Sequence, residues 1–150
     1  MNNAAHFHLL INHFPVILPM VGFCILIIGV FLKSEIVKRV SYGLFIVASA
    51  FTFLAMNSGS GAEEIVEKLG RSHRIIHEHE ELAETFAIFS YVLGLFSILA
   101  FWLNWKKTPF KELSMYVVAI IALVVIFSAR GVGQSGGEIS HKEITSGFSE

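Results

Sequence analysis

The sequence has 150 residues, of which 54% are apolar and 15% are charged, and its formal net charge is -1. Soluble globular domains carry about 25% charged residues, so this composition indicates a membrane protein. The near-neutral charge argues against a basic nucleic-acid-binding protein. The single cysteine, Cys24, excludes a disulfide framework, a zinc site built from cysteines and covalent haem attachment through a C-x-x-C-H motif.

Four segments are apolar and long enough to cross a bilayer core of about 30 Å, which takes about 20 helical residues. No Lys or Arg precedes Lys33, so we interpret the first segment as a retained helix and not as a cleaved signal peptide. The sequence leaves open whether residues 57–61 break the second helix or continue it. We predict an all-α, integral-membrane four-helix bundle that forms a single domain over residues 1–150. The predicted spans are residues 14–32, 40–56, 83–105 and 113–129.

The basic residues predict the orientation of the bundle. Six of the 11 Lys and Arg residues lie in the two short connections, residues 33–39 and 106–112. The positive-inside rule therefore places both connections on the cytoplasmic side. We expect the chain to lie in the inner (cytoplasmic) membrane of the cell. Both termini and the longer connection, residues 57–82, then face outward, as do all seven histidines. These are His6, His8, His13, His73, His77, His79 and His141.

The connection between the second and third spans carries helical patterns. Residues 62–69 place apolar side chains at helical spacing, and Ser72 is a good N-cap for a helix that continues into the third span. On that helix His79 belongs to the apolar stripe, whereas His77 belongs to the opposite, polar face. We therefore predict a short amphipathic helical extension, with His79 directed into the bundle.

A second histidine is expected at a similar depth. His13 precedes Pro15, a residue that suits the first turn of a helix, and the first and third spans both run inward from the outer face. Imidazoles that face each other from two helices, such as His13 and His79, can ligate a metal ion or both faces of a haem iron. After the fourth span, Arg130 stands at the membrane boundary. The glycine-rich stretch beyond it permits tight turns and close backbone approach, and would allow His141 to fold back over the outer end.

Several motifs resemble those of a known family. They are "HLLINHFPV" at residues 8–16, "GSGAEE" after the second span, "HEHEELA" before the third and "SGGEISHKEI" after the fourth. The chain is similar, over nearly its whole length, to a widespread uncharacterised family of small four-helix bacterial membrane proteins. Members are sometimes fused or adjacent to cytochrome c domains, so the resemblance implies respiratory electron transfer and b-type haem. The resemblance implies four signature histidines, with His77 as an alternative to His79. The sequence departs from the family at Leu9, where proline is frequent. These histidines are His8, His13, His79 and His141.

These observations predict a haem b electron-transfer protein. His13 and His79 would form the axial pair, and Arg130 would bind a propionate. No nucleophile elbow, phosphate loop or zinc-protease motif is present, so we expect a respiratory subunit and not a stand-alone enzyme. Expected partners are the lipid bilayer, a quinone, and an outward-facing cytochrome c or other respiratory subunits. The sequence does not decide whether the chain forms an oligomer, and nucleic acid is not an expected partner.

Three alternatives use the same residues. A second haem would take His8 or His77 together with His141. A non-haem site would bind Zn, Fe or Cu through mixed nitrogen and oxygen ligands. A structural subunit would use its histidines only for packing, with a solvated glutamate-rich face. The candidate non-haem ligands are Glu63, Glu64, His77, Glu81 and His141.

Overall fold

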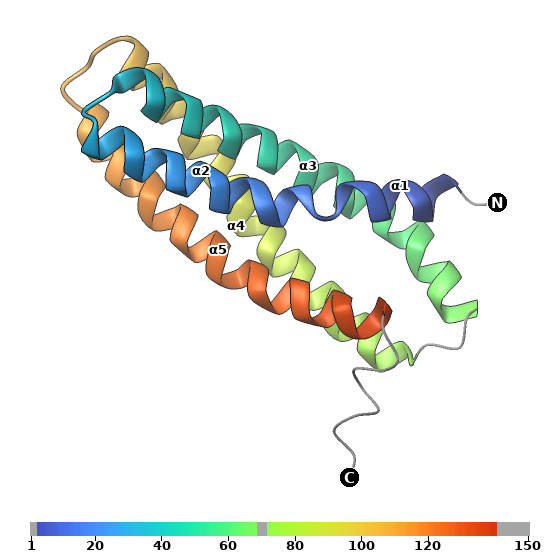
Figure 1. Cartoon of the computed structure of the whole chain (residues 1–150). Helices are drawn as coiled ribbons and strands as arrows, with labels where there is room; N and C mark the ends of the chain where they lie inside the picture. Colours follow the sequence, from blue (N-terminus) through green and yellow to red (C-terminus); the bar gives the residue numbers. More distant parts are fainter. Residues whose placement is uncertain (1–2, 69–71, 141–150) are drawn as a thin grey trace.

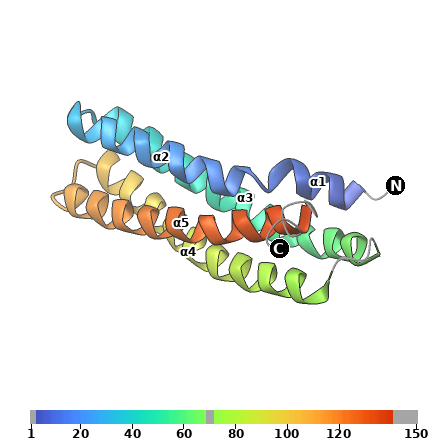
Figure 2. The same cartoon turned by 60° about the horizontal axis from the view of Figure 1, so that its bottom comes forward.

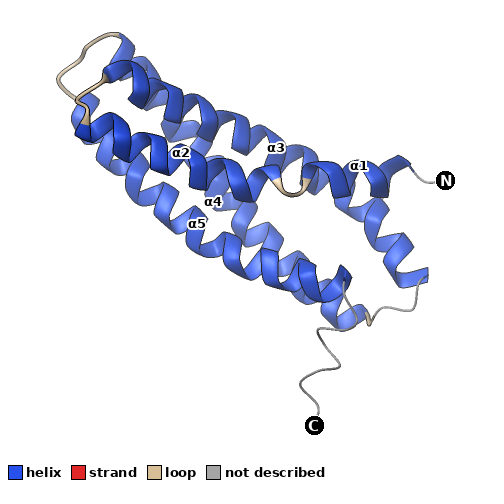
Figure 3. Ribbon diagram, in the orientation of Figure 1, coloured by secondary structure: helices blue, strands red, loops and turns tan. Residues whose placement is uncertain are grey.

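The computed structural model describes the backbone of residues 3–68 and 72–140, and the side chains of residues 6–59 and 72–139. Within these ranges the chain consists of helices joined by short turns, without a strand (Figure 3). The predicted all-α fold is therefore confirmed for the described residues. The helices are α1 (Asn3–Ile11), α2 (Phe14–Phe31), α3 (Glu35–Lys68), α4 (His73–Trp105) and α5 (Lys111–Ser140).

Helices α2 to α5 form a closed bundle, in which α2 packs on α3, α3 on α4, α4 on α5, and α5 back on α2 (Figure 1). Helix α1 lies beyond α2 in nearly the same direction and packs on α3. The turns at residues 32–34 and 106–110 lie at one end of the bundle, which we call the turn end. Helix α1, the start of α4 and the end of α5 lie toward the opposite end, the histidine end (Figure 2).

Four stretches of helix are long and apolar enough to cross a membrane, which agrees in number with the four predicted spans. The first combines most of α1 with α2. Large apolar side chains cover the outside of the bundle; Phe31 is 82% exposed and Phe127 is 80% exposed. Such a surface suits lipid and not water, which is consistent with a multi-pass membrane protein. The four stretches are His6–Phe31, Glu35–Gly59, His73–Trp105 and Lys111–Ile139.

Two helices run further than the sequence indicates. Helix α3 does not end near Met56 but continues to Lys68, so residues 57–61 extend the helix, and the predicted amphipathic segment is its last part. Helix α5 likewise continues through the glycine-rich stretch to Ser140, where a turn was expected. Helix α4 begins directly after Ser72, the predicted N-cap.

Polar side chains that bond to their own helix explain these extensions. Asn57, Ser58 and Ser135 each donate a hydrogen bond to a backbone carbonyl three or four residues earlier, at 2.7, 3.0 and 3.0 Å. This local bonding satisfies the polar groups without leaving the helical conformation. These polar residues therefore mark the end of an apolar span, but the helix continues beyond them.

The N-terminal region contains a helix that was not predicted. Helix α1 precedes α2, and a turn at Asn12 and His13 separates the two. The break has a direct cause in Pro15, which lacks the N–H that would bond to the carbonyl of Ile11. Pro15 is buried in the first turn of α2, as the sequence predicts.

Small and hydroxyl-bearing residues line the seam between α3 and α4. Ser90, Ser97 and Asn104 recur every seven residues on α4 and are all buried. The hydroxyl oxygens of Thr52 and Ser90 lie 2.8 Å apart and share a hydrogen bond across the seam. Small residues allow membrane helices to approach closely, so this seam brings α3 against α4.

An ionic network around the buried Lys38 joins three helices at the turn end. Lys38 is only 5% exposed, and its Nζ lies 3.0 Å from Glu35 and 3.4 Å from Glu112. Glu35 also accepts hydrogen bonds from Lys111, at 3.1 Å, and from the side-chain amide of Asn104. Because removing one partner would leave an uncompensated charge, the network fixes the relative positions of α3, α4 and α5.

The α3–α4 seam gives a test of the packing. A Cβ added at Gly94 would lie 2.6 Å from both Cβ and Oγ of Ser49, whereas one added at Gly43 would meet no atom within 4 Å. We expect Gly94→Ala to destabilise the protein by about 1–3 kcal/mol through overpacking. Gly43→Ala gains the same helix propensity, up to about 1 kcal/mol, without the clash. Thermal unfolding in detergent would compare the two variants. Equal stabilities would contradict the close packing of α4 against α3 at Gly94.

Candidate cofactor site at the histidine end

His8 is held against α3 by its Nδ1 atom. Its ring is partly buried, and Nδ1 lies 3.1 Å from the carbonyl oxygen of Ala55 and 3.0 Å from Oγ of Ser58. A carbonyl oxygen only accepts, so Nδ1 carries the proton and donates to it. In the neutral imidazole this leaves the lone pair of Nε2 available for a ligand. Gly59 lies beside the ring, since a Cβ there would be 3.9 Å from Cε1 of His8.

His79 is held against α5 in the same way. Its Nδ1 lies 2.8 Å from Oγ of Ser135, which itself donates to the carbonyl oxygen of Gly131. Ser135 also lies 3.2 Å from the carbonyl oxygen of Val132, and when its hydroxyl donates to either carbonyl it accepts from Nδ1 of His79, which leaves the lone pair of Nε2 available. Gly136 lies beside the ring: a Cβ there would make an ordinary van der Waals contact, 3.4 Å from Cε1 of His79.

The two imidazoles lie within range of a Coulombic interaction. They belong to α1 and α4, which both pack on α3. Both rings are partly buried, and Ile11 and Ile76, buried on the same two helices, add apolar surroundings. The histidine end therefore brings two imidazoles together, each with a hydrogen-bond partner at Nδ1.

His13 occupies a different position from the predicted one. It is the N-cap residue of α2; its carbonyl accepts from the N–H of Ile17 at 2.9 Å, while its side chain is exposed. His8 is therefore the more buried of the two histidines. The sequence held a signal for this difference, because the buried stripe of α2 extends back to Ile11 and His8 at spacings of three and four residues. That stripe is Pro15, Pro19, Gly22, Leu26 and Gly29.

The remaining predicted site residues lie elsewhere. His77 is exposed, and its ring nitrogens lie 3.5 Å from Glu81 and 3.9 Å from Glu80 on the same helix. The predicted separation of His77 from the inward-facing His79 is thus confirmed. Arg130 is exposed on α5, ten residues before the helix ends at Ser140. The side chains of Glu63 and Glu64, and the whole of His141, lie outside the described residues.

The described part of the site holds two imidazoles and no larger group of metal ligands. Among the side chains that the structure describes, no three His, Cys, Asp or Glu gather into a group that could hold a metal ion. The candidate non-haem ligands Glu63, Glu64 and His141 lie outside those side chains.

The glycines of α5 act by close approach and not by turning the chain. Gly131 lies against Leu82, to which an added Cβ would approach within 3.4 Å, and Gly136 lies against His79. An added Cβ would meet no atom within 4 Å at Gly133 or Gly137, so these two glycines leave the helix surface bare. This part of α5 could therefore accept a flat group against its backbone.

Comparison with family models, with characterised proteins and with solved structures finds no match to this chain. The resemblance to the family of small bacterial membrane proteins stays a prediction that rests on the motifs themselves.

Cross-linking would test the pairing of His8 with His79. In a background in which the exposed Cys24 is replaced by Ser, we expect His8→Cys/His79→Cys to be joined readily by a short bis-maleimide, since the two side chains are neighbours. His13→Cys/His79→Cys is the matched control and should react more slowly. Mass spectrometry of the digested protein would detect the linked peptides, and faster linkage through position 13 would restore the pair predicted from the sequence.

Proposed function

We propose that this protein is a membrane-embedded haem b electron-transfer protein, a subunit of a respiratory assembly, with His8 and His79 as the axial ligands. The observation that carries the proposal is the pair of partly buried imidazoles, each held by Nδ1 and each with Nε2 free. In metal proteins a ligating histidine almost always donates its second ring N–H to a fixed acceptor, which orients the ring. The acceptors here are Ala55 and Ser58 for one ring and Ser135 for the other.

The surroundings fit a flat, largely apolar group. Glycines stand beside both rings, at Gly59 and Gly136, so the backbone can approach such a group closely. Bundle proteins build cofactor sites from side chains on facing helices, and here the two ligands come from α1 and α4. Arg130, exposed on α5, is a candidate partner for a propionate.

When bound, the haem would supply one-electron transfer. The protein's own part is to hold the two imidazoles in one tautomer and to limit the access of water to them. We propose a quinol or a partner subunit as the electron donor and an outward-facing cytochrome as the acceptor. The distribution of Lys and Arg supports placing the histidine end on the outer side of a bacterial inner membrane.

A dithionite-reduced minus oxidised absorption spectrum of the detergent-purified protein, with metal analysis of the same sample, tests the proposal. We expect the sharp α-band of a six-coordinate b-type haem, its loss in His8→Ala and in His79→Ala, and its retention in His13→Ala and in His77→Ala. Circular dichroism would verify that each variant stays helical. A colourless protein that contains Zn, Cu or non-haem iron after expression with added haem would overturn the haem assignment, as would a full spectrum in His8→Ala.

The hydrogen bond to His79 gives a second prediction. Ser135→Ala removes the acceptor of Nδ1, so we expect haem to be retained about 10–100-fold more weakly, as for other partners of metal-ligating histidines. Ser128→Ala is the matched control, because its hydroxyl bonds only to the carbonyl of Val125 on the same helix, at 2.9 Å. Transfer of haem to excess apomyoglobin would measure the retention. Equal transfer from the two variants would show that Ser135 does not position the ring.

A further inference from the structure

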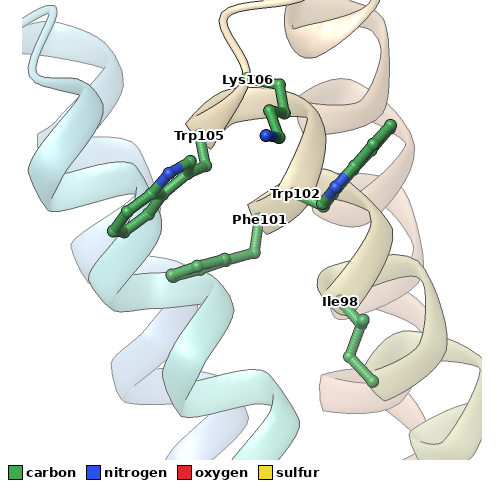
Figure 4. Close-up of a pocket in the computed structure, with 5 residues that line it drawn as sticks. All are labelled: Ile98, Phe101, Trp102, Trp105 and Lys106. Carbon is green, nitrogen blue, oxygen red and sulfur yellow. The ribbon is translucent and has the colours of Figure 1, made fainter.

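An open groove lies on the outside of α4 at the turn end, far from the histidine pair. Its volume is about 470 Å³, and its lining is aromatic apart from one aliphatic and one basic side chain (Figure 4). Phe101 and Trp105 stack with their ring centroids 5.9 Å apart, and Trp102 and Trp105 are 53% and 60% exposed. The lining residues are Ile98, Phe101, Trp102, Trp105 and Lys106.

The lining is graded along the helix axis. Lys106 lies at the end of α4, the two Trp side chains lie just below it on either side, and Ile98 lies deeper along the helix (Figure 4). Eight residues separate Lys106 from Ile98, which is about 12 Å of helix. Basic, aromatic and aliphatic groups in this order match the headgroup, interfacial and hydrocarbon layers of one bilayer leaflet.

Two cations lie at the groove. Lys106 lines it, and the guanidinium of Arg39 lies 5.2 Å from the ring centroid of Trp105, while its Nε donates to the backbone carbonyl of Glu35 at 3.2 Å. The carboxylates of Glu35 and Glu112, the acidic residues of this end, are bonded to Lys38 and Lys111. Arg39 and Lys106 therefore have no acidic partner among the described side chains.

Two further cations lie at the turn end but do not line the groove. Lys33 and Lys107, in the two turns, adopt positive φ angles of 50° and 53°. They add positive charge to this end of the bundle without belonging to the groove.

We infer that this groove binds an anionic glycerophospholipid. Arg39 and Lys106 contact its phosphate, the indole rings of Trp102 and Trp105 flank the glycerol region, and an acyl chain lies along Phe101 and Ile98. Basic residues beside a membrane span attract anionic lipid, and the aromatic walls keep that attraction at one place on the helix surface. The inference rests on the membrane location of the bundle and is independent of the proposed haem.

The chain has only two tryptophans, and both line the groove, so their fluorescence reports directly on its occupant. The protein would be reconstituted in phosphatidylcholine vesicles that contain a small fraction of acyl-brominated phosphatidylglycerol or acyl-brominated phosphatidylcholine. We expect the anionic lipid to quench the fluorescence beyond what random contact gives, and the zwitterionic lipid to quench at the random level. Equal quenching by the two lipids would overturn the inference and leave the groove as ordinary lipid-exposed surface.

Charge variants locate the binding. We expect Lys106→Gln and Arg39→Gln each to lower the affinity for the anionic lipid about fivefold, as one basic residue does at a lipid surface. Lys33→Gln is the matched control, because it removes the same charge from the same end but from the other turn. An equal loss in the control would show general attraction to the surface and would overturn the specific site. A brominated quinone that quenches with the same dependence on Lys106 and Arg39 would also overturn it.

Discussion

The structure depends on one constraint: inside a bilayer every backbone N–H and C=O must be hydrogen-bonded within the protein. A chain that is 54% apolar meets this constraint by remaining helical almost throughout its described length. The polar stretches after the second and fourth spans obey the same rule, since Asn57, Ser58 and Ser135 bond to carbonyls of their own helices. The helices therefore project beyond the apolar spans, and their projecting parts build the histidine end.

The histidine end depends on a break in the helical backbone hydrogen bonding at a single proline. Pro15 removes one backbone donor, and the turn at Asn12 and His13 follows. Helix α1 can then lie on α3 and bring the ring of His8 to Ala55 and Ser58. On the other side of the site, α5 packs on α4, and Oγ of Ser135 reaches Nδ1 of His79. The break before α2 and the packing of α5 on α4 together give each imidazole a hydrogen-bond partner on a neighbouring helix.

The two ends of the bundle differ in chemistry. The turn end carries an ionic network around the buried Lys38 and an aromatic groove lined by one cation, Lys106. The histidine end carries imidazoles whose available nitrogens are not committed to any bond in the described structure. Buried ionic groups specify how helices fit together, whereas the nitrogens of neutral imidazoles can bind a ligand. The seam of Ser90, Ser97 and Asn104 joins these ends through close contact between α3 and α4.

The sequence by itself determined the class of fold, the number of spanning helices and the inward direction of His79, because apolar runs and helical periodicity are local properties. It left open where α3 ends, and it favoured His13, because the turn before Pro15 changes the course of the chain over a few residues. Only the tertiary structure placed His8 against Ser58, 50 residues away, and His79 against Ser135, 56 residues away. The network around Lys38 likewise joins residues more than 70 positions apart. Such contacts depend on the rotation and depth of each helix relative to its neighbours, and the packing of small residues between the helices decides both.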